Sequence, residues 1–292
     1  MKFVTFSGKK TSTQNPSAVL SRDILTPGVL IGDEIADLTG LAHASVLAII
    51  EGGDLALKEV AAKLDKAPRV ALADVTLHAP IRPPRVFAIG LNYASHAAES
   101  KMAVQKVPTV FMKLSSSVVG PDTPVILPKI SSQPDYEAEF AVVISKPGYQ
   151  IPASDWKQYV FGYTIVNDVS ARDIQLATSQ WSLGKSFPTF TPLGPAIVTA
   201  DEVADPHALD ISLTINGETL QSANTRDLIF KIPALIEYIS STTPLEAGDV
   251  ISTGTPEGVG LGRTPQRWLK PNEEMVITIE KVGKLRNRTV AE

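Results

Sequence analysis

The sequence predicts an α+β protein that is mainly β, with a mixed, mostly antiparallel sheet or roll preceded by a small N-terminal unit. Apolar runs of strand length, such as RVFAIG (85–90) and EMVITIE (274–280), recur through the second part of the chain. The few helical patterns interrupt these runs without alternating regularly with them, which disfavours a parallel βαβ sheet. A proline-rich stretch near residue 80 separates the first part from the rest.

The N-terminal unit combines strand and helix patterns. Strands are predicted over KFVTF (2–6) and within residues 27–40, where Gly32 and Asp33 mark a turn. Apolar residues at helical spacing predict helices over residues 41–52 and 54–64. Three prolines between residues 77 and 85 then force extended backbone. We therefore predict a small domain over residues 1–80 and a larger domain over residues 81–292.

The larger domain is predicted to consist mostly of strands. Asn216 and Gly217, between two alternating runs, are typical of a type I′ hairpin turn. Helical patterns are found over residues 92–101, 151–159, 171–179 and 232–241. The predicted strands cover residues 85–90, 108–113, 124–128, 137–145, 161–170, 195–200, 209–221, 248–254 and 274–280.

Composition narrows the possible functions. The chain has 292 residues, of which 43% are hydrophobic and 20% charged, and this is the composition of a globular protein with a substantial core. Its formal net charge of -4 provides no basic surface for nucleic acid or an anionic membrane. The absence of cysteine excludes disulfides, thiolate nucleophiles, iron–sulfur clusters and zinc–thiolate sites. We expect a small-molecule site, in which oxygen or imidazole must hold any metal.

The sequence also bears on location. The first residues, MKFVTFSGKK, lack the apolar core of a signal peptide. No uninterrupted apolar run approaches the roughly 20 residues that a membrane span requires. We therefore predict a cytoplasmic protein without membrane partners.

Three acids alternate in DYEAEF, namely Asp135, Glu137 and Glu139. In a strand, alternate side chains share a face, so all three are expected to point the same way. Such a pattern is often a solvated strand face. However, the apolar residues AVVI follow directly, which indicates a strand that enters a core. Asp168 lies at the end of another apolar strand, in YTIVNDVS.

Carboxylates at strand ends suit a cation. The Cα atoms of Glu137 and Glu139 are expected to lie roughly 6.5 to 7 Å apart, close enough for both side chains to reach one ion. A third carboxylate from a neighbouring strand would complete a ligand set made only of oxygen. Such a set favours Mg²⁺, Mn²⁺ or Ca²⁺ over Zn²⁺ or copper.

A second cluster is His96 and Glu99 in GLNYASHAAES. Their i, i+3 spacing places both side chains on one face of a helix beginning near Tyr93 or Ala94, where the carboxylate can orient the imidazole as a general base. The alternative is an ordinary exposed histidine beside an exposed glutamate.

Two loops add candidate substrate contacts. Lys185 lies in WSLGKSFPTF, where a rigid loop near a metal would let it bind a carboxylate or balance an enolate, although most lysines are simply solvated. The glycine-rich turn ISTGTPEGVG offers backbone amides and the hydroxyl of Thr253 or Thr255. This turn does not match the nucleotide-binding pattern GxxxxGK[ST].

Seven motifs in order resemble the fumarylacetoacetate hydrolase (FAH) family over about residues 85–280. They are NYASHAAE, PTVFMK, DYEAEFAVVI, NDVSARDIQ, GKSF followed by PLGP, NGE and STGTPEGVG. Each is weak by itself, but the seven in sequence order are specific. The N-terminal unit is similar to the small domain that many bacterial members carry.

The resemblance implies an FAH-type β-roll, usually a homodimer, with Mg²⁺ or Mn²⁺ at its centre. By position, the metal ligands are Glu137, Glu139 and Asp168. The catalytic pair is His96 with Glu99, on a segment that closes over substrate, and Lys185 acts beside it. The implied or candidate substrate contacts are Gln175, Thr255, Thr253 and Tyr93.

Two positions depart from the family pattern. Pro188 stands in GKSFPTF where many members have aspartate, and Leu114 follows Lys113 where proline is frequent. Both are expected beside the substrate, so they bear on specificity and leave the metal ligands intact.

These residues lead us to expect a metal-dependent hydrolase that cleaves a C–C bond in a small 2,4-diketo acid of the acylpyruvate or fumarylpyruvate type. His96, oriented by Glu99, would activate water, while the metal and Lys185 would stabilise the enolate that leaves. One alternative uses the same enolate in an oxaloacetate-type decarboxylase or an isomerase of unsaturated 2-oxo diacids. Another is a catalytically silent, metal-stabilised binding protein.

Overall fold

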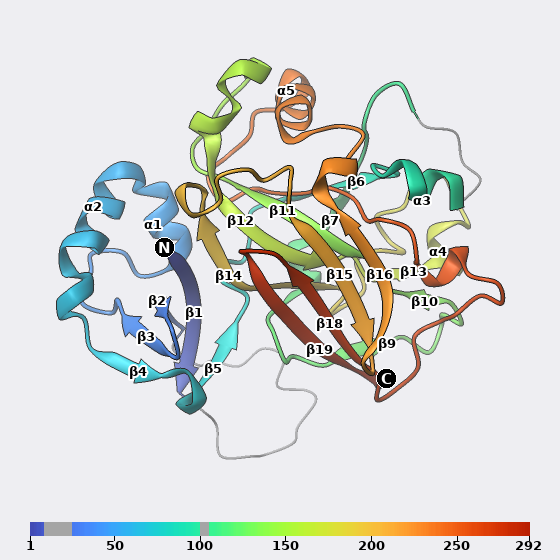
Figure 1. Ribbon diagram of the computed structural model, residues 1–292, viewed down its shortest axis with the longest axis horizontal. Coiled ribbons are helices and arrows are strands. Elements are labelled where there is room, and N and C mark those ends of the chain that lie inside the picture. Colours follow the sequence, from blue (N-terminus) through green and yellow to red (C-terminus); the bar gives the residue numbers. More distant parts are fainter. Residues whose placement is uncertain (9–24, 100–104) are drawn as a thin grey trace.

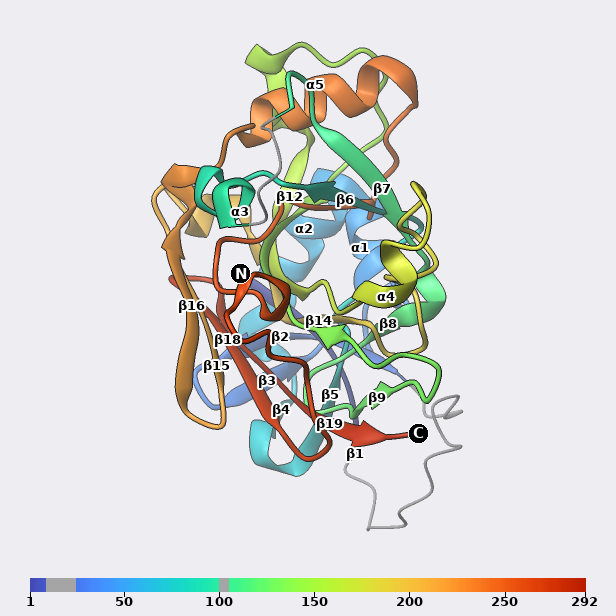
Figure 2. The same ribbon diagram turned by 90° about the vertical axis from the view of Figure 1, so that its right-hand side faces the viewer.

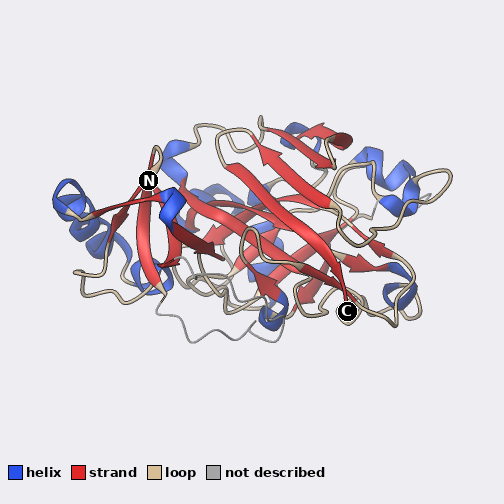
Figure 3. Ribbon diagram, turned by 90° about the horizontal axis from the view of Figure 1, so that it is seen from below, coloured by secondary structure: helices blue, strands red, loops and turns tan. Residues whose placement is uncertain are grey.

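The computed structural model describes residues 1–8, 25–99 and 105–292 (Figure 1). Mixed sheets dominate these ranges and helices lie around them, which confirms the predicted α+β, mainly β class (Figure 3). Most strand pairs are antiparallel, while β17–β6, β14–β8 and β19–β9 are parallel. No helix in the described ranges is long and apolar enough to cross a membrane.

The largest sheet contains twelve strands and passes through the centre of the molecule. Its main path follows the order β4 (Arg69–Ala71), β3 (Glu34–Asp37), β2 (Thr26–Ile31), β1 (Lys2–Gly8), β14 (Thr191–Thr199), β12 (Val160–Asn167), β11 (Ala138–Ile144), β17 (Val250–Ser252), β6 (Val86–Gly90) and β7 (Thr109–Lys113). Beside this path, β5 (Val75–His78) pairs with β1 and β8 (Val118–Val119) pairs with β14.

A second sheet of five strands packs against the first. Its order is β16 (Glu218–Asn224), β15 (Asp210–Ile215), β18 (Glu274–Ile279), β19 (Gly283–Ala291) and β9 (Val125–Leu127). Leu213 and Ile277 from this sheet share one hydrophobic core with Phe140 and Tyr163 of β11 and β12. A third, two-stranded sheet joins β10 (Pro134–Asp135) to β13 (Ser170–Ala171).

The predicted hairpin is confirmed. Asn216 and Gly217 join β15 to β16 with φ values of 51° and 84°. A type I′ turn requires positive φ at both central residues, and asparagine and glycine tolerate it best.

The helices are few, and several are shorter than their sequence patterns. α1 (Val46–Glu51) and α2 (Gly53–Lys63) cover the N-terminal strands, and α5 (Ile232–Thr242) lies at the top in Figure 2. The pattern over residues 171–179 gives only α4 (Arg172–Gln175), and residues 153–159 form a 3₁₀ helix. α3 (Ala94–Glu99) begins as predicted, while residues 100 and 101 of that pattern lie outside the described residues.

The N-terminal strands extend the central sheet at one side (Figure 1). Phe3 of β1 pairs with Ile197 of β14, so the sheet continues across the proline-rich stretch. Phe3 also belongs to the same buried cluster as Ala141 and Val143 of β11. Residues 79–84 have no regular structure, as predicted, and Ile81 among them is buried.

β19 was not predicted as a strand. Its sequence, GKLRNRTVA, alternates charged and buried positions, with Leu285, Asn287 and Thr289 facing inward. Only one face of this strand is buried, so charged residues alternate with buried ones along it. No continuous apolar run therefore predicts this strand.

Candidate metal and substrate site

Three acids converge where β11 begins and β12 ends. Glu139 pairs with Val166 across the two strands, and Asp168 follows the end of β12. The amide of Asp168 donates to the carbonyl of Glu137 at 2.9 Å, which fixes the two backbones side by side. One carboxylate oxygen from each of Glu137, Glu139 and Asp168 lies within 4.8 Å of the others. All three residues are buried, with at most 4% of their surface exposed.

Asp135 is not one of the three converging acids, although Arg172 binds both its carboxylate and that of Glu137. The chain leaves strand geometry between β10 and β11. Asp135 instead accepts hydrogen bonds from the amides of Gly260 at 2.7 Å and Leu261 at 3.0 Å. The carboxylate of Asp135 also accepts a hydrogen bond from Nε of Arg172 at 2.8 Å. Asp135 therefore anchors a loop and an arginine.

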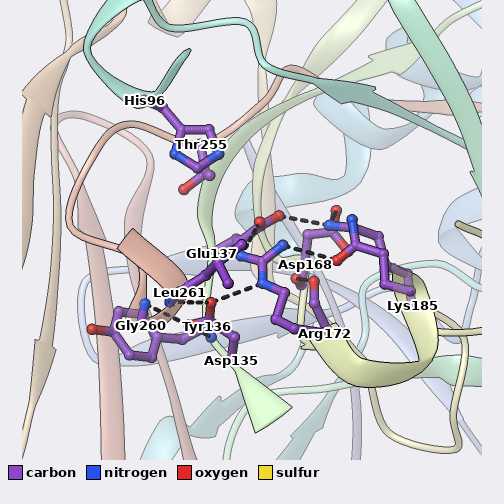
Figure 4. Close-up of polar contacts among 12 residues, drawn as sticks. His96, Asp135, Tyr136, Glu137, Asp168, Arg172, Lys185, Thr255, Gly260 and Leu261 are labelled. Carbon is purple, nitrogen blue, oxygen red and sulfur yellow. Dashed lines mark hydrogen bonds and ion pairs between the residues drawn. The ribbon is translucent and has the colours of Figure 1, made fainter. Parts of the chain in front are cut away.

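Three cations pair with the triad, namely Lys113, Arg172 and Lys185, of which Figure 4 labels Arg172 and Lys185. Nζ of Lys185 donates to Glu137 at 2.8 Å and to Asp168 at 2.7 Å. Nη2 of Arg172 donates to the other oxygen of Glu137 at 2.6 Å. Burial by itself raises the pKa of Glu137, but Arg172 and Lys185 outweigh it and lower this pKa far below its usual range. Glu137 is therefore held as an anion.

Among the described residues, no lysine or arginine forms an ion pair with Glu139. Its carboxylate accepts from the hydroxyl of Ser252 at 2.5 Å and from the amide of Gly254 at 3.0 Å. Burial, followed by the negative charges of Asp168 and Glu137, raises the pKa of Glu139 to about 8. These surroundings favour the protonated form of the carboxyl, and a bound cation would favour the anion.

The donor set fits a hard divalent cation. The buried cluster holds four carboxyl groups against three cationic side chains, which are Lys113, Arg172 and Lys185. Burial, and then this excess of neighbouring negative charge, raise the pKa of Glu139. An all-oxygen triad of this kind suits Mg²⁺ or Mn²⁺. Sequence reasoning missed Lys113 and Arg172, whose contacts link residues far apart in the chain.

A small cavity of about 50 Å³ opens beside the triad. Four predicted site residues besides the acids line it, namely His96, Gln175, Lys185 and Thr255. The other lining residues are Ile89, Gly90, Leu91, Phe111, Glu137, Glu139, Arg172, Leu176, Trp181 and Leu261. Of the predicted catalytic and metal-binding residues, His96, Lys185, Glu137 and Glu139 line this cavity, while Glu99 and Asp168 do not.

His96 and Glu99 face each other on α3. Nδ1 of His96 lies 3.5 Å from Oε2 of Glu99 and has no hydrogen-bond partner among the residues described. The Glu99 carboxylate also accepts from the amide of Gly258 at 3.1 Å. This contact attaches α3 to the glycine-rich turn that carries Thr255.

Two other candidates lie outside the cavity lining. The hydroxyl of Thr253 donates to the carbonyl of Phe140 at 2.8 Å, so it holds β11. Tyr93 is fully buried, and burial, followed by the charges of Glu139 and Asp227, raises its pKa. Its hydroxyl has no partner in the described part of the chain.

The other two candidate substrate contacts, Gln175 and Thr255, already hydrogen-bond to protein side chains but each keeps a free donor. Gln175 accepts from Nη1 of Arg172 through Oε1 at 3.0 Å, which leaves its NH₂ group as the donor. The hydroxyl of Thr255 accepts from Gln221 at 2.8 Å and can still donate. Leu114 and Pro188, the two departures from the family pattern, are exposed and do not line the cavity.

Comparisons with known proteins show the family of this chain. The family profile described as "Fumarylacetoacetate (FAA) hydrolase C-terminal" matches residues 85–290. Oxaloacetate tautomerase Fahd2a, mitochondrial, from Rattus norvegicus is 45% identical over 269 residues, which is 89% of this chain and 85% of that protein.

Two solved structures are similar over the whole chain. Fumarylacetoacetate hydrolase from psychrophilic Exiguobacterium antarcticum is 34% identical with a TM-score of 0.85, covering 100% of both chains. Maleylpyruvate hydrolase from Sphingobium sp. SYK-6, in complex with manganese (II) ion and pyruvate, is 32% identical with a TM-score of 0.82, covering 100% of this chain and 99% of that one.

Proposed function

Because the chain belongs to the fumarylacetoacetate hydrolase family, we propose that it is a divalent-metal-dependent enzyme that interconverts the keto and enol forms of oxaloacetate or a similar short 2-oxo diacid. The observation that carries this proposal is the convergence of three buried acids, a paired lysine and a histidine on one small cavity. The similarity to an oxaloacetate tautomerase supports proton transfer over the C–C hydrolysis predicted first from the sequence.

The metal would be held by Glu137, Glu139 and Asp168. When bound, Mg²⁺ or Mn²⁺ supplies a Lewis acid that polarises the 2-oxo group and stabilises negative charge on its oxygen. Manganese (II) and pyruvate are present in a similar solved structure, which supports this choice of ion and ligand.

His96 would act as the general base. It lines the cavity, and Glu99 lies 3.5 Å from its Nδ1, so the carboxylate can stabilise the positive charge that the imidazole gains. The imidazole would remove a proton from the carbon next to the 2-oxo group. The electron pair of the C–H bond then forms the C=C bond of the enolate, and the π pair of the carbonyl moves to its oxygen. Returning the proton to that oxygen gives the enol, and the reverse sequence gives the ketone.

The chain's own cations would stabilise the enolate. Lys185 is almost fully buried beside Glu137 and Asp168, so its positive charge is poorly screened by water. Gln175 and Thr255 provide hydrogen-bond donors for a carboxylate or carbonyl oxygen. Positive charge fixed before the reaction lowers the energy of an enolate more than that of the neutral ketone.

A second candidate is the C–C bond hydrolysis of 2,4-diketo acids. The similarity to maleylpyruvate hydrolase favours it, and His96 would then deprotonate water. Decarboxylation of oxaloacetate would share the enolate. The silent binding protein is the least supported alternative, because the acids and His96 are all present around the cavity.

The test is to follow hydrogen exchange and product formation separately. With Mg²⁺ present, purified protein should accelerate both the loss of enol-oxaloacetate and deuterium exchange at the carbon next to the 2-oxo group. His96→Ala should reduce these rates by about 10²- to 10⁴-fold with metal binding retained. Release of CO₂ at the same rate would indicate decarboxylation. Cleavage of an acylpyruvate with ¹⁸O from water in the acid, without enol conversion, would establish the hydrolase.

Two further parts of the proposal rest on the family resemblance and on the sequence. The homodimer would be tested by sedimentation analysis. The cytoplasmic location stays a prediction, since the similar rat protein is named as mitochondrial.

A further inference from the structure

The cavity beside the acids is lined by two kinds of residue. Its charged and polar lining residues include Glu137, Glu139, Lys185, His96 and Thr255. Its apolar lining residues are Ile89, Leu91, Phe111, Leu176, Trp181 and Leu261. Apolar residues with a few convergent polar groups are typical of small-ligand sites, in which the polar groups orient the ligand and the walls select its size.

Trp181 has the largest side chain among these apolar residues, and its position is constrained. Its indole packs edge-on against the ring of Phe111, with centroids 5.4 Å apart and an interplanar angle of 67°. On strand β6, a Cβ added to Gly90 would lie 2.5 Å from Cζ3 of Trp181. The indole therefore occupies the space that any larger residue at position 90 would need.

Phe111 connects this wall to the charged groups. Nζ of Lys185 lies 5.0 Å from the centroid of the Phe111 ring. The same Nζ contacts Glu137 and Asp168. Phe111 therefore contacts both the indole of Trp181 and the ammonium group of Lys185, which places the indole in the same small site as the acids.

The volume of the cavity also restricts the size of the ligand. A water molecule needs roughly 10 to 15 Å³ of such space, so a cavity of about 50 Å³ has room for only a few water-sized groups. A 2-oxo acid of two to four carbons can replace water there with modest adjustment. An acid with a bulky group beyond the fourth carbon needs the space that the indole fills.

We infer that Trp181 is a specificity-determining residue that restricts this site to short 2-oxo acids and excludes 2,4-dioxo acids with bulky ends. The inference rests on the proposed function, in that the 2-oxo acid end of the ligand meets the acids. It goes further by assigning the size limit to one side chain. Each methylene that a pocket excludes accounts for about 10- to 200-fold in discrimination.

The test compares two ligands by calorimetry in the presence of saturating Mg²⁺. Oxalate serves as the short ligand, and 4-phenyl-2,4-dioxobutanoate serves as a 2,4-dioxo acid with a bulky end. Wild-type protein should bind oxalate more tightly. Trp181→Ala should improve the affinity for the phenyl compound by at least about tenfold, while the affinity for oxalate changes by less than about threefold.

A milder variant and a matched control distinguish an effect of Trp181 on ligand size from a general loss of folding. Trp181→Leu retains an apolar side chain and should give a smaller gain in the same direction. Trp156→Phe removes a tryptophan outside the cavity, next to His207, and should leave both affinities unchanged. Oxalate should alter tryptophan fluorescence in wild type and in Trp156→Phe, and this signal should disappear in Trp181→Leu.

The outcomes separate the two proposals. If wild type binds oxalate but the ratio of the two affinities is the same in both Trp181 variants, the size limit is not set by this residue, while the proposed function stands. If wild type binds neither ligand with Mg²⁺ present, both proposals are overturned.

Discussion

The ammonium nitrogen of Lys113 lies 2.6 Å from Oδ1 of Asp168, and both side chains are fully buried. Lys113 also donates to the backbone carbonyls of Val169 and Lys185. It therefore ties together the end of β7, the triad member Asp168 and the loop that carries Lys185. Burial lowers the pKa of Lys113, against the opposing effect of Asp168, so the ion pair depends on this partner.

Replacing Lys113 by methionine should strongly destabilise the protein. The change leaves one oxygen of buried Asp168 without its cation, and breaking a buried pair from one side costs about 3 to 5 kcal/mol. Urea unfolding in the absence of metal would measure the loss. Arg286→Met is the control, since Arg286 and Asp122 form an exposed pair of the same 2.6 Å length. The control should cost at most about 1 kcal/mol, and equal losses in the two variants would contradict the assignment.

Divalent metal should stabilise the protein through the triad alone. A ligand at 100 times its Kd adds about 2.7 kcal/mol to the free energy of unfolding, so Mg²⁺ or Mn²⁺ should raise the melting temperature. Glu139→Gln and Asp168→Asn should abolish this rise. Asp135→Asn should lower the melting temperature without metal, because it weakens the contact to Arg172, yet it should still respond to metal. A lost response in Asp135→Asn would place that residue in the metal site.

Metal binding should strengthen as pH rises towards 8. Burial and the neighbouring acids raise the pKa of Glu139 to about 8, so a proton competes with the metal for this carboxyl below that pH. The apparent affinity should rise by at most about tenfold per pH unit and then level off above pH 8. Calorimetry in two buffers of different ionisation enthalpy would also detect the displaced proton. An affinity for Mg²⁺ that is flat from pH 6 to 9 would contradict this.

The carboxyl of Glu139 should also make the stability of the metal-free protein depend on pH. In the unfolded chain a glutamate has a pKa of about 4.3, so between that pH and about 8 only the folded state holds the proton on Glu139. Its contribution to stability is therefore fully present below pH 4.3 and is lost as pH rises through 8. Saturating Mg²⁺ should cancel this loss, which thermal unfolding at several pH values would measure.

Sequence patterns were sufficient for most strands and for the acids at their ends. The apolar runs that contain β11 and β12 also fix their ends, and the acids lie at those ends. The hairpin at Asn216 and Gly217 follows from local backbone preference alone. These features depend on neighbours in sequence, whereas the grouping of Asp168 with Glu137 and Glu139 came from the resemblance to the family.

The parts that were missed depend on distant partners. Lys113 meets Asp168 across 55 positions of the chain, and Arg172 meets Glu137 across 35. A lysine at the end of the apolar run TVFMK was the available signal that Lys113 is buried. Alternation along DYEAEF could not show that Asp135 lies in β10, separate from β11, and that its carboxylate binds the amide of Gly260.

Glu99 should contribute to turnover in two separable ways. Its charge lies 3.5 Å from Nδ1 of His96, and its oxygens accept from the amide of Gly258. Glu99→Gln retains an oxygen for Gly258 but removes the charge, whereas Glu99→Ala removes both. A bond to a charged acceptor is roughly twice as strong as a neutral one, so Glu99→Gln also weakens the attachment of α3.

We expect kcat for enol conversion to fall by about tenfold in Glu99→Gln and by about 10²-fold in Glu99→Ala, within the range of general base catalysis. Mg²⁺ affinity should stay unchanged in both, because Glu99 is not one of the three converging acids. If Glu99→Ala retained the wild-type kcat, neither the charge nor the contact with Gly258 would serve His96, and the base would act without a partner.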